Sequence, residues 1–210
     1  MELWQNELDI LPQKDPKTFI QEYCQKKYKT IPLYKLIEEA GTKHKPKFLV
    51  SLKIKDNEVE AEGVSKQKAE ILAAKKMIKI INKFFYKNIG KSYRWIDRLV
   101  WNDTKWMDYT NNSNLETYIL TENDDLIGFF ELLFHPETSK CEVAYFGILD
   151  QFIGKKYGGY LLSEALKLGF RKNTKKVWLH TCSLDHKHAL KNYLGPVSYT
   201  HLRAHETVLD

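Results

Sequence analysis

The hydrophobic pattern of residues 15–82 changes from helical to alternating and back to helical, and this order restricts the fold strongly. Apolar residues recur at helical spacing after Pro16, a residue tolerated at the first helical position, and Asp15 is placed to cap that helix. Three alternating segments follow, which predict strands, at residues 34–39, 47–55 and 59–64. A second helix with an apolar stripe begins at Ser65. The predicted order is helix, three antiparallel strands, helix.

The same stretch carries the chain's net positive charge. Residues 14–83 hold 17 lysines and 9 acidic residues, whereas residues 84–210 hold 16 basic and 15 acidic residues. A concentrated positive field favours a polyanionic partner, although a solubilising surface is the alternative. Lys66 and Lys68 stand in the first turn of the second predicted helix, where the helix dipole already presents positive charge. A phosphate bound there would turn that conflict into a binding site.

The runs DPKTFIQEYCQKKY, PLYKLIEEAG, GTKHKPKF and EGVSKQKAEILAAKK, in this order, resemble the double-stranded RNA-binding domain, particularly the one that closes ribonuclease III chains. The resemblance implies an α-β-β-β-α domain over residues 14–83. In that family, helix one and the loop between the first two strands enter successive minor grooves, and the start of helix two meets the intervening phosphates. By position, the resemblance implies these RNA-contacting residues: Thr18, Gln21, Glu22, His44, Ser65, Lys66 and Lys68.

Two positions depart from the family pattern and bear on the strength of RNA binding. Thr42 replaces the usual loop proline and Gln67 replaces one lysine of the helix-two cluster, so we expect weaker phosphate contact without loss of binding. The acid-rich catalytic helices of ribonuclease III are absent from the sequence, and residues 1–13 are expected to be a short leader. We therefore expect the chain to bind duplex RNA without cutting it.

The second part of the chain begins with a tryptophan-rich segment that we interpret as helical core, and then reads as alternating strands and helices. Strands are predicted at residues 115–120, 126–134, 142–149 and 177–182. Between the last two lies a loop punctuated by Gly154, Gly158 and Gly159, followed by an amphipathic helix. Glycines let the backbone approach a ligand closely, and a helix start with exposed amides can hold a pyrophosphate. Tight packing is the alternative reason for such glycines.

These segments together resemble the GNAT superfamily of acyl-CoA-dependent N-acetyltransferases over residues 84–195, with IGKKYGG at the acetyl-CoA loop and LDHKHALKNYL as a late helix. The resemblance implies that acetyl-CoA is held by the backbone near Ile148 and by the loop residues Gly154, Lys155, Lys156, Tyr157, Gly158 and Gly159. It implies that Tyr193 protonates the leaving thiolate. Glu142 is the candidate general base for the amine acceptor, and a solvent-facing Glu142 is the alternative.

Two positions of this part depart from the family pattern. Lys156 stands where a glycine is usual, and His186 stands where many members carry an asparagine. Lys156 would narrow the conformational freedom of the loop while adding a cation for phosphate. His180, His186 and His188 lie close together in the chain, but their placement on strand and helix gives no coherent ligand geometry, so no metal site is expected.

The end of the chain does not continue the family pattern. After Leu194 the family needs two more strands, but the remaining residues show no sustained alternation. The string SYTHLRAHETVLD is similar to translated sequencing-adapter read-through, so residues 196–210 are expected to be foreign. We therefore expect a transferase domain that is incomplete at its C-terminus, with an open sheet edge.

The predicted fold class is α+β: an α-β-β-β-α RNA-binding domain followed by a mixed α/β GNAT-like acyl-CoA transferase domain. No apolar run is long enough for a membrane span and no secretory signal opens the chain, so a cytoplasmic location is expected. The leading functional hypothesis is duplex RNA binding joined to acetyl-CoA-dependent transfer to an unknown amine. Two alternatives stay open: a fragment of ribonuclease III running into an acetyltransferase, and a non-catalytic RNA-binding interaction protein.

Overall fold

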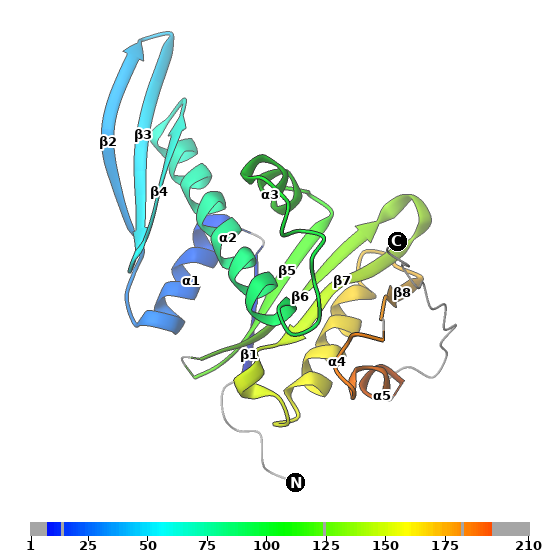
Figure 1. The fold of residues 1–210 in the computed structure, drawn as a ribbon. Coiled ribbons are helices and arrows are strands. Elements are labelled where there is room, and N and C mark those ends of the chain that lie inside the picture. Colours follow the sequence, from blue (N-terminus) through cyan, green and yellow to red (C-terminus); the bar gives the residue numbers. More distant parts are fainter. Residues whose placement is uncertain (1–7, 14, 124, 182, 195–210) are drawn as a thin grey trace.

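The computed structural model describes residues 8–13, 15–123, 125–181 and 183–194, and it contains two β-sheets joined by helices (Figure 1). The smaller sheet is antiparallel, with the strands β2 (Leu33–Thr42), β3 (Lys45–Ile54) and β4 (Asn57–Gly63) in that order. The larger sheet has the order β1-β5-β6-β7-β8, formed by β1 (Leu8–Pro12), β5 (Leu115–Glu122), β6 (Asp125–His135), β7 (Lys140–Ile148) and β8 (Lys176–Leu179). The predicted α+β class is confirmed.

The first two helices begin where the sequence predicts. α1 (Pro16–Tyr28) is capped by Asp15, whose carboxylate accepts a hydrogen bond from the Thr18 amide at 2.8 Å. That hydrogen bond holds the pKa of Asp15 below its ordinary value. α2 (Lys66–Gly90) is capped by Ser65, whose hydroxyl accepts from the Lys68 amide at 3.2 Å. Both caps satisfy amides that the first helical turn leaves without a partner.

Part of the expected leader belongs to the larger sheet. Within residues 1–13, the segment Leu8–Pro12 forms β1, which pairs antiparallel with β5 from Leu8 opposite Glu122 to Pro12 opposite Tyr118. Leu11 is buried, so the strand adds to the core as well as to the sheet. The five residues Leu8–Pro12 are too few to show a strand pattern, and their pairing with β5 is what makes them a strand.

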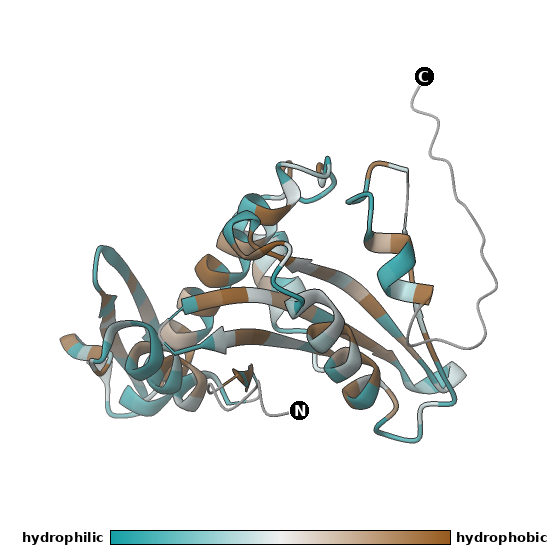
Figure 2. Cartoon of the chain, turned by 90° about the horizontal axis from the view of Figure 1, so that it is seen from below, coloured by the Kyte–Doolittle hydropathy of each residue, from teal (hydrophilic) through white to brown (hydrophobic). Residues whose placement is uncertain are grey.

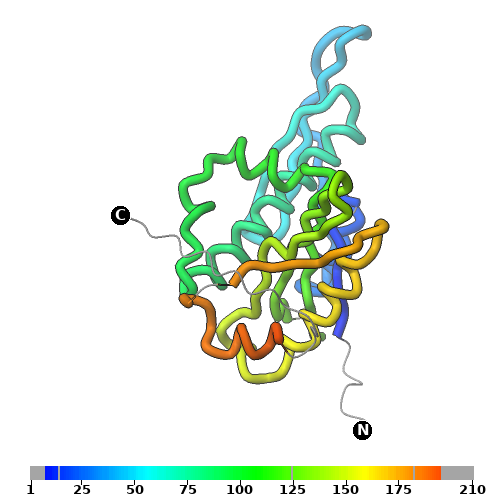
Figure 3. Tube along the Cα trace, turned by 90° about the vertical axis from the view of Figure 1, so that its right-hand side faces the viewer, coloured from blue at the N-terminus to red at the C-terminus, as the bar shows by residue number. Residues whose placement is uncertain are grey.

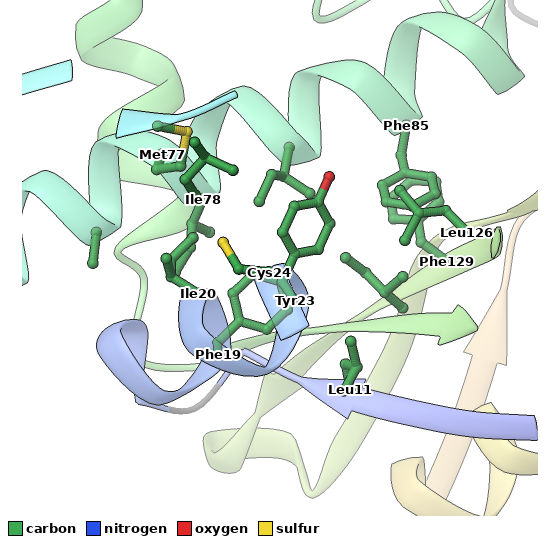
Figure 4. Packing of buried hydrophobic residues seen from close by; sticks show 14 of the residues in the cluster. Leu11, Phe19, Ile20, Tyr23, Cys24, Met77, Ile78, Phe85, Leu126 and Phe129 are labelled. Atoms are coloured by element: carbon green, nitrogen blue, oxygen red, sulfur yellow. The ribbon is translucent and has the colours of Figure 1, made fainter. Parts of the chain in front are cut away.

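Helix α2 crosses the expected boundary between residues 83 and 84 without interruption. Its first half packs on β3 and β4, and its last turns reach the larger sheet (Figure 1). One continuous core joins the two parts: it contains Phe19 of α1, Phe85 of α2 and Phe129 of β6 (Figure 4). The three-stranded sheet therefore packs on helices that also reach the larger sheet, and both parts share a single apolar interior.

A second core lies on the opposite face of the larger sheet, under α4 (Tyr157–Gly169). Leu161 and Ala165 of α4 pack there against Phe130 and Leu132 of β6. Apolar residues concentrate on the central strands and on the helix faces against them (Figure 2). The hairpin of β2 and β3 projects from the end of the molecule (Figure 3). Two short helices complete the fold: α3 (Asp103–Thr110) and α5 (Ala189–Leu194).

Two lysines of α2 form ion pairs that hold α3. The ammonium of Lys79 lies 3.1 Å from Asp103 Oδ2, and that of Lys83 lies 2.6 Å from Asp103 Oδ1. Lys79 is buried. The paired Asp103 fixes the start of α3 on α2, which periodicity alone does not reveal.

None of the helices formed by the described residues has the length and apolar character needed to cross a membrane.

Candidate functional site

The loop before α4 has the backbone conformation of a ligand-binding turn. Gly154 has a φ of +86° and Lys156 has a φ of 68°, both in the left-handed region. Lys156 is the N-cap of α4 and makes no side-chain cap hydrogen bond. A non-glycine residue in this region is strained, which explains why a glycine is usual at this position. The first amides of α4 are thus left to another partner, and an anion suits them.

These amides face a cavity of about 510 Å³. Seven predicted residues line it: Ile148, Gly154, Lys156, Tyr157, Gly158, Gly159 and Tyr193. Lys155 is not among its described lining residues, and its ammonium instead lies 5.2 Å from the centre of the Phe152 ring. The structure therefore brings together the predicted loop residues and the predicted late tyrosine, although they are far apart in the chain.

Strand β7 separates from β8 beside the cavity. The parallel pairing of the two strands runs from Lys140 opposite Lys176 to Val143 opposite Leu179. Beyond that point, Phe146, Gly147 and Ile148 line the cavity. Glu131 is opposite Tyr145 and Leu132 is opposite Val143, so Ala144 is an extra residue that makes a β-bulge. The separation gives an extended ligand a strand edge to bind. This edge includes Ile148, where the family resemblance implies a backbone contact with acetyl-CoA.

Glu142, the predicted base, lies elsewhere. Its carboxylate is 3.6 Å from His135 Nε2 and 3.7 Å from His180 Nε2. Glu142 is not among the described residues that line the cavity, and it precedes Ile148 by six strand positions, about 20 Å along β7. The geometry brings Tyr193 to the cavity and leaves Glu142 near the other end of the strand.

The cavity also has walls outside the predicted cofactor-binding and catalytic residues. One side is formed by Ile89 at the end of α2 and by Tyr93 and Trp95 in the segment that follows. The other is formed by residues around α5, including Asp185 and His186. The aromatic spacing of the tryptophan-rich segment was the available signal, but it indicates core equally well. Trp95 is half-buried and packs on the core, with its ring centre 4.8 Å from that of Tyr145, but it lies in the irregular segment between α2 and α3 and not in the predicted helix.

The predicted RNA-binding residues lie at two helix starts and a hairpin turn. Thr18 and Gln21 are exposed on α1, Glu22 is half-buried there, and His44 is exposed between β2 and β3. Ser65 is half-buried as the cap of α2, with Lys66 and Lys68 exposed beside it. An ion pair of 2.6 Å between Lys17 and Glu70 joins the first turns of α1 and α2. Two of the expected contact regions are therefore adjacent, and both are open to solvent.

Comparison with known proteins agrees with this division. The family model "Acetyltransferase (GNAT) family" matches residues 75–195, and "Double-stranded RNA binding motif" matches residues 16–81. The two matches overlap at residues 75–81, within the helix that both parts of the structure share. The overlap reflects the continuous α2.

Curated relatives match the first part of the chain. Ribonuclease 3 of Aquifex aeolicus is 47% identical over 68 residues, covering 32% of this chain and 31% of the relative. Ribonuclease 3 of Pelagibacter ubique is 43% identical over 77 residues, covering 35% of each. The chain thus spans about a third of the length of these relatives.

A solved structure shares the fold of the second part. An aminoglycoside acetyltransferase from an uncultured soil metagenomic sample, in complex with trehalose, has a TM-score of 0.51. It is 8% identical in sequence, and the match covers 64% of this chain and 92% of that chain. This likeness concerns the fold alone. With the family match over more than half of its length, the chain belongs to the GNAT acetyltransferase family and carries a double-stranded RNA-binding motif in its first part.

Proposed function

We propose that this protein binds duplex RNA and transfers an acyl group from acetyl-CoA to a primary amine. The observation that supports the transferase role most strongly is the cavity where the uncapped start of α4 meets the open edge of β7. Members of the GNAT family use acetyl-CoA generally, which supplies the acyl group as a thioester.

The residues of the cavity suit the parts of such a cofactor. The backbone from Gly154 to Gly159 would hold the pyrophosphate, because its amides begin α4 and the Lys156 ammonium adds positive charge. The edge of β7 near Ile148 would bind the pantetheine arm through backbone hydrogen bonds. A Cβ at Gly158 would meet Asn192 Nδ2 at 3.5 Å, so Asn192 lies directly over the first turn of α4.

Tyr193 is the proposed general acid of the reaction. It lines the same cavity as the cofactor loop, is half-buried, and packs against Phe146 with ring centres 6.1 Å apart. A tyrosine hydroxyl held in this way can give its proton to a thiolate as that thiolate leaves. Glu142 has less support as a base because it stands outside the cavity.

The RNA-binding role rests on a different surface. Exposed Lys66 and Lys68 flank the capped start of α2, and the exposed side of α1 lies next to it. Backbone amides and lysine side chains at a helix start suit a phosphate, and the exposed polar residues of α1 suit ribose hydroxyls. The ribonuclease 3 relatives share this part of the sequence, which supports the same class of ligand.

Calorimetry on the full chain tests both parts with separate titrations. Acetyl-CoA should bind with one site per chain, and a 20-base-pair RNA duplex should bind with an affinity that falls as salt rises. Release of thiol in the presence of a primary amine tests transfer itself. Duplex binding without acetyl-CoA binding would instead favour a non-catalytic RNA-binding protein.

A further inference from the structure

The segment between α2 and α3 carries two residues of the cavity wall but has little regular structure of its own. Its backbone hydrogen bonds are local turns, such as Tyr93 N to Gly90 O at 3.0 Å and Trp95 N to Gly90 O at 3.1 Å. Arg94, which stands between the two wall residues, has a left-handed φ of 52°. A strained residue persists only where its surroundings fix it, so tertiary contacts must hold this segment in place.

The strongest of these contacts is a buried ion pair. Arg98 is 3% exposed and Glu131 of β6 is 1% exposed, and their side chains meet in a fork with distances of 3.3 and 3.0 Å. The Tyr109 hydroxyl donates to Glu131 Oε2 at 2.7 Å. The guanidinium carbon lies 3.9 Å from the ring centres of both Tyr109 and Tyr145. The charges are therefore paired, and two aromatic rings enclose the cation.

The residue before Arg98 adds a second attachment. Asp97 Oδ1 accepts from the Tyr86 hydroxyl at 2.8 Å, and Asp97 Oδ2 accepts from the Tyr145 hydroxyl at 2.6 Å. Tyr145 adjoins the bulge of β7 and is followed by Phe146, which lines the cavity. Asp97 and Arg98 thus tie the segment to α2, α3, β6 and β7 at once.

Stability alone is a weak explanation for this arrangement. Two charges lose their hydration on burial, and well-packed apolar residues are often as stabilising as a buried ion pair. What the pair supplies that apolar side chains lack is a fixed direction and distance, through the planar fork of the guanidinium. Arg98 is not among the described lining residues of the cavity, so its influence there has to pass through the segment that it anchors.

We propose that the Arg98–Glu131 pair, together with Asp97, positions Tyr93 and Trp95 as one wall of the cavity in which the proposed transfer takes place. Arg98 is then a positioning residue for the cavity, and it acts through the segment that carries Tyr93 and Trp95. This inference rests on the proposed transferase function.

The test uses two variants of the full chain that keep their aromatic packing. Arg98→Met with Glu131→Leu removes both charges and leaves neither one buried without its partner. Tyr145→Phe removes only the hydroxyl that Asp97 binds. The control is Tyr118→Phe, which changes another buried tyrosine of the same sheet, on the opposite face. Thiol release with tyramine gives KM and kcat, calorimetry gives the Kd for acetyl-CoA, and hydrogen–deuterium exchange reports on residues 91–102.

We expect the double variant to raise both the KM for tyramine and the Kd for acetyl-CoA severalfold, because Tyr93 and Trp95 line the same cavity as the loop before α4. Tyr145→Phe should raise that KM severalfold, and Tyr118→Phe should leave it unchanged. Exchange in residues 91–102 should accelerate in the first two variants only. Unchanged KM and exchange in folded Tyr145→Phe and in the double variant would overturn the proposal. Absence of acetyl-CoA binding by the unmodified chain would instead refute the transferase function, and the exchange measurement would still decide whether Arg98 positions the segment.

Discussion

Ile89, in the last turn of α2, lies directly against Gly147 of β7. A Cβ added at Gly147 would stand 2.5 Å from Ile89 Cγ2 and 3.5 Å from Trp95. Both Ile89 and Gly147 line the cavity, so the helix that starts at the proposed RNA-binding face ends at the proposed cofactor site. The close approach depends on the missing side chain at position 147.

Gly147→Ala should therefore destabilise the folded protein at this contact. Ile89 is buried and β-branched, so it cannot yield easily to a new methyl group, and we expect a loss of about 1–3 kcal/mol in the free energy of unfolding. Acetyl-CoA binding should weaken as the wall shifts. Urea unfolding and calorimetry measure the two effects. Gly159→Ala is the control, because its new Cβ would meet Asn192 only at 3.7 Å. Equal stability of the two variants would contradict this account.

Lys156 combines a strained backbone with a useful charge, and two substitutions separate these properties. Lys156→Gly and Lys156→Ala both remove the ammonium, but only glycine adopts a φ of 68° without strain. We expect the glycine variant to exceed the alanine variant by about 1 kcal/mol in unfolding free energy. Both should bind coenzyme A more weakly than the unmodified chain, with a smaller dependence on salt. Thermal unfolding and titrations at two ionic strengths check this. An alanine variant as stable as the glycine variant would argue against strain.

Asp103 links the stability of the α2–α3 contact to pH. Hydrogen bonds from Lys83 and Lys79 lower the pKa of Asp103 from its ordinary 3.8 to about 2. Its contribution is therefore present above about pH 4 and is lost as the pH falls from 4 towards 2. Because the carboxylate is 73% exposed, we expect less than about 1 kcal/mol.

Asp103→Asn tests this by removing the titrating group. The difference in unfolding free energy from the unmodified chain should be largest near pH 6 and should shrink below pH 4. Asp108→Asn, an exposed change on the same helix, serves as the control. A difference that stays constant from pH 6 to pH 3 would show that the ionised carboxylate does not contribute through these lysines.

The start of α2 should dominate the salt dependence of RNA binding. Lys66→Gln with Lys68→Gln removes two exposed cations beside the Ser65 cap, without reversing charge. The slope of log K against log salt should fall by about 2, one for each lost phosphate contact, and affinity should fall at low salt. Lys167→Gln with Lys176→Gln changes two exposed lysines on α4 and β8 as the control. An equal effect of the two pairs would mean that only overall charge matters.

The sequence predicted the elements that carry their own periodicity, and the missed features are tertiary. The helix starting at Pro16, the three short strands and the cofactor loop before α4 are all where their patterns indicate. The strand Leu8–Pro12 was missed because five residues carry too little pattern, and its partner is more than a hundred positions away. The sharing of α2 by both parts was missed because an amphipathic stripe shows that a face is buried, without naming what covers it.

In the candidate site, too, the residues with a local sequence pattern were predicted and those fixed by tertiary contacts were missed. The loop could be predicted from its glycines, because a positive φ such as that of Gly154 favours glycine. Tyr193 was placed by its resemblance to a family motif, and the cavity gathers it with the loop. Tyr93, Trp95 and the Arg98–Glu131 pair had no comparable signal, because a buried arginine is indistinguishable from a surface one in a single sequence.

The shared core predicts that the two parts unfold together. Phe129 of β6 is 1% exposed and stacks on Phe85 of α2 with ring centres 5.2 Å apart, in the cluster that also contains Phe19 and Leu52 of the RNA-binding part. Phe129→Ala should cost about 3–5 kcal/mol. If the core is continuous, this change lowers the urea midpoint for RNA-duplex binding as much as it lowers the midpoint seen by circular dichroism. In a chain of two independent domains, the variant would instead lose RNA binding at the same urea concentration as the unmodified chain, because Phe129 lies outside the RNA-binding residues. Leu132→Ala, in the second core across the sheet, should behave like Phe129→Ala only if cooperativity extends through the whole sheet, so comparing the two variants locates the edge of the unit that unfolds in one step.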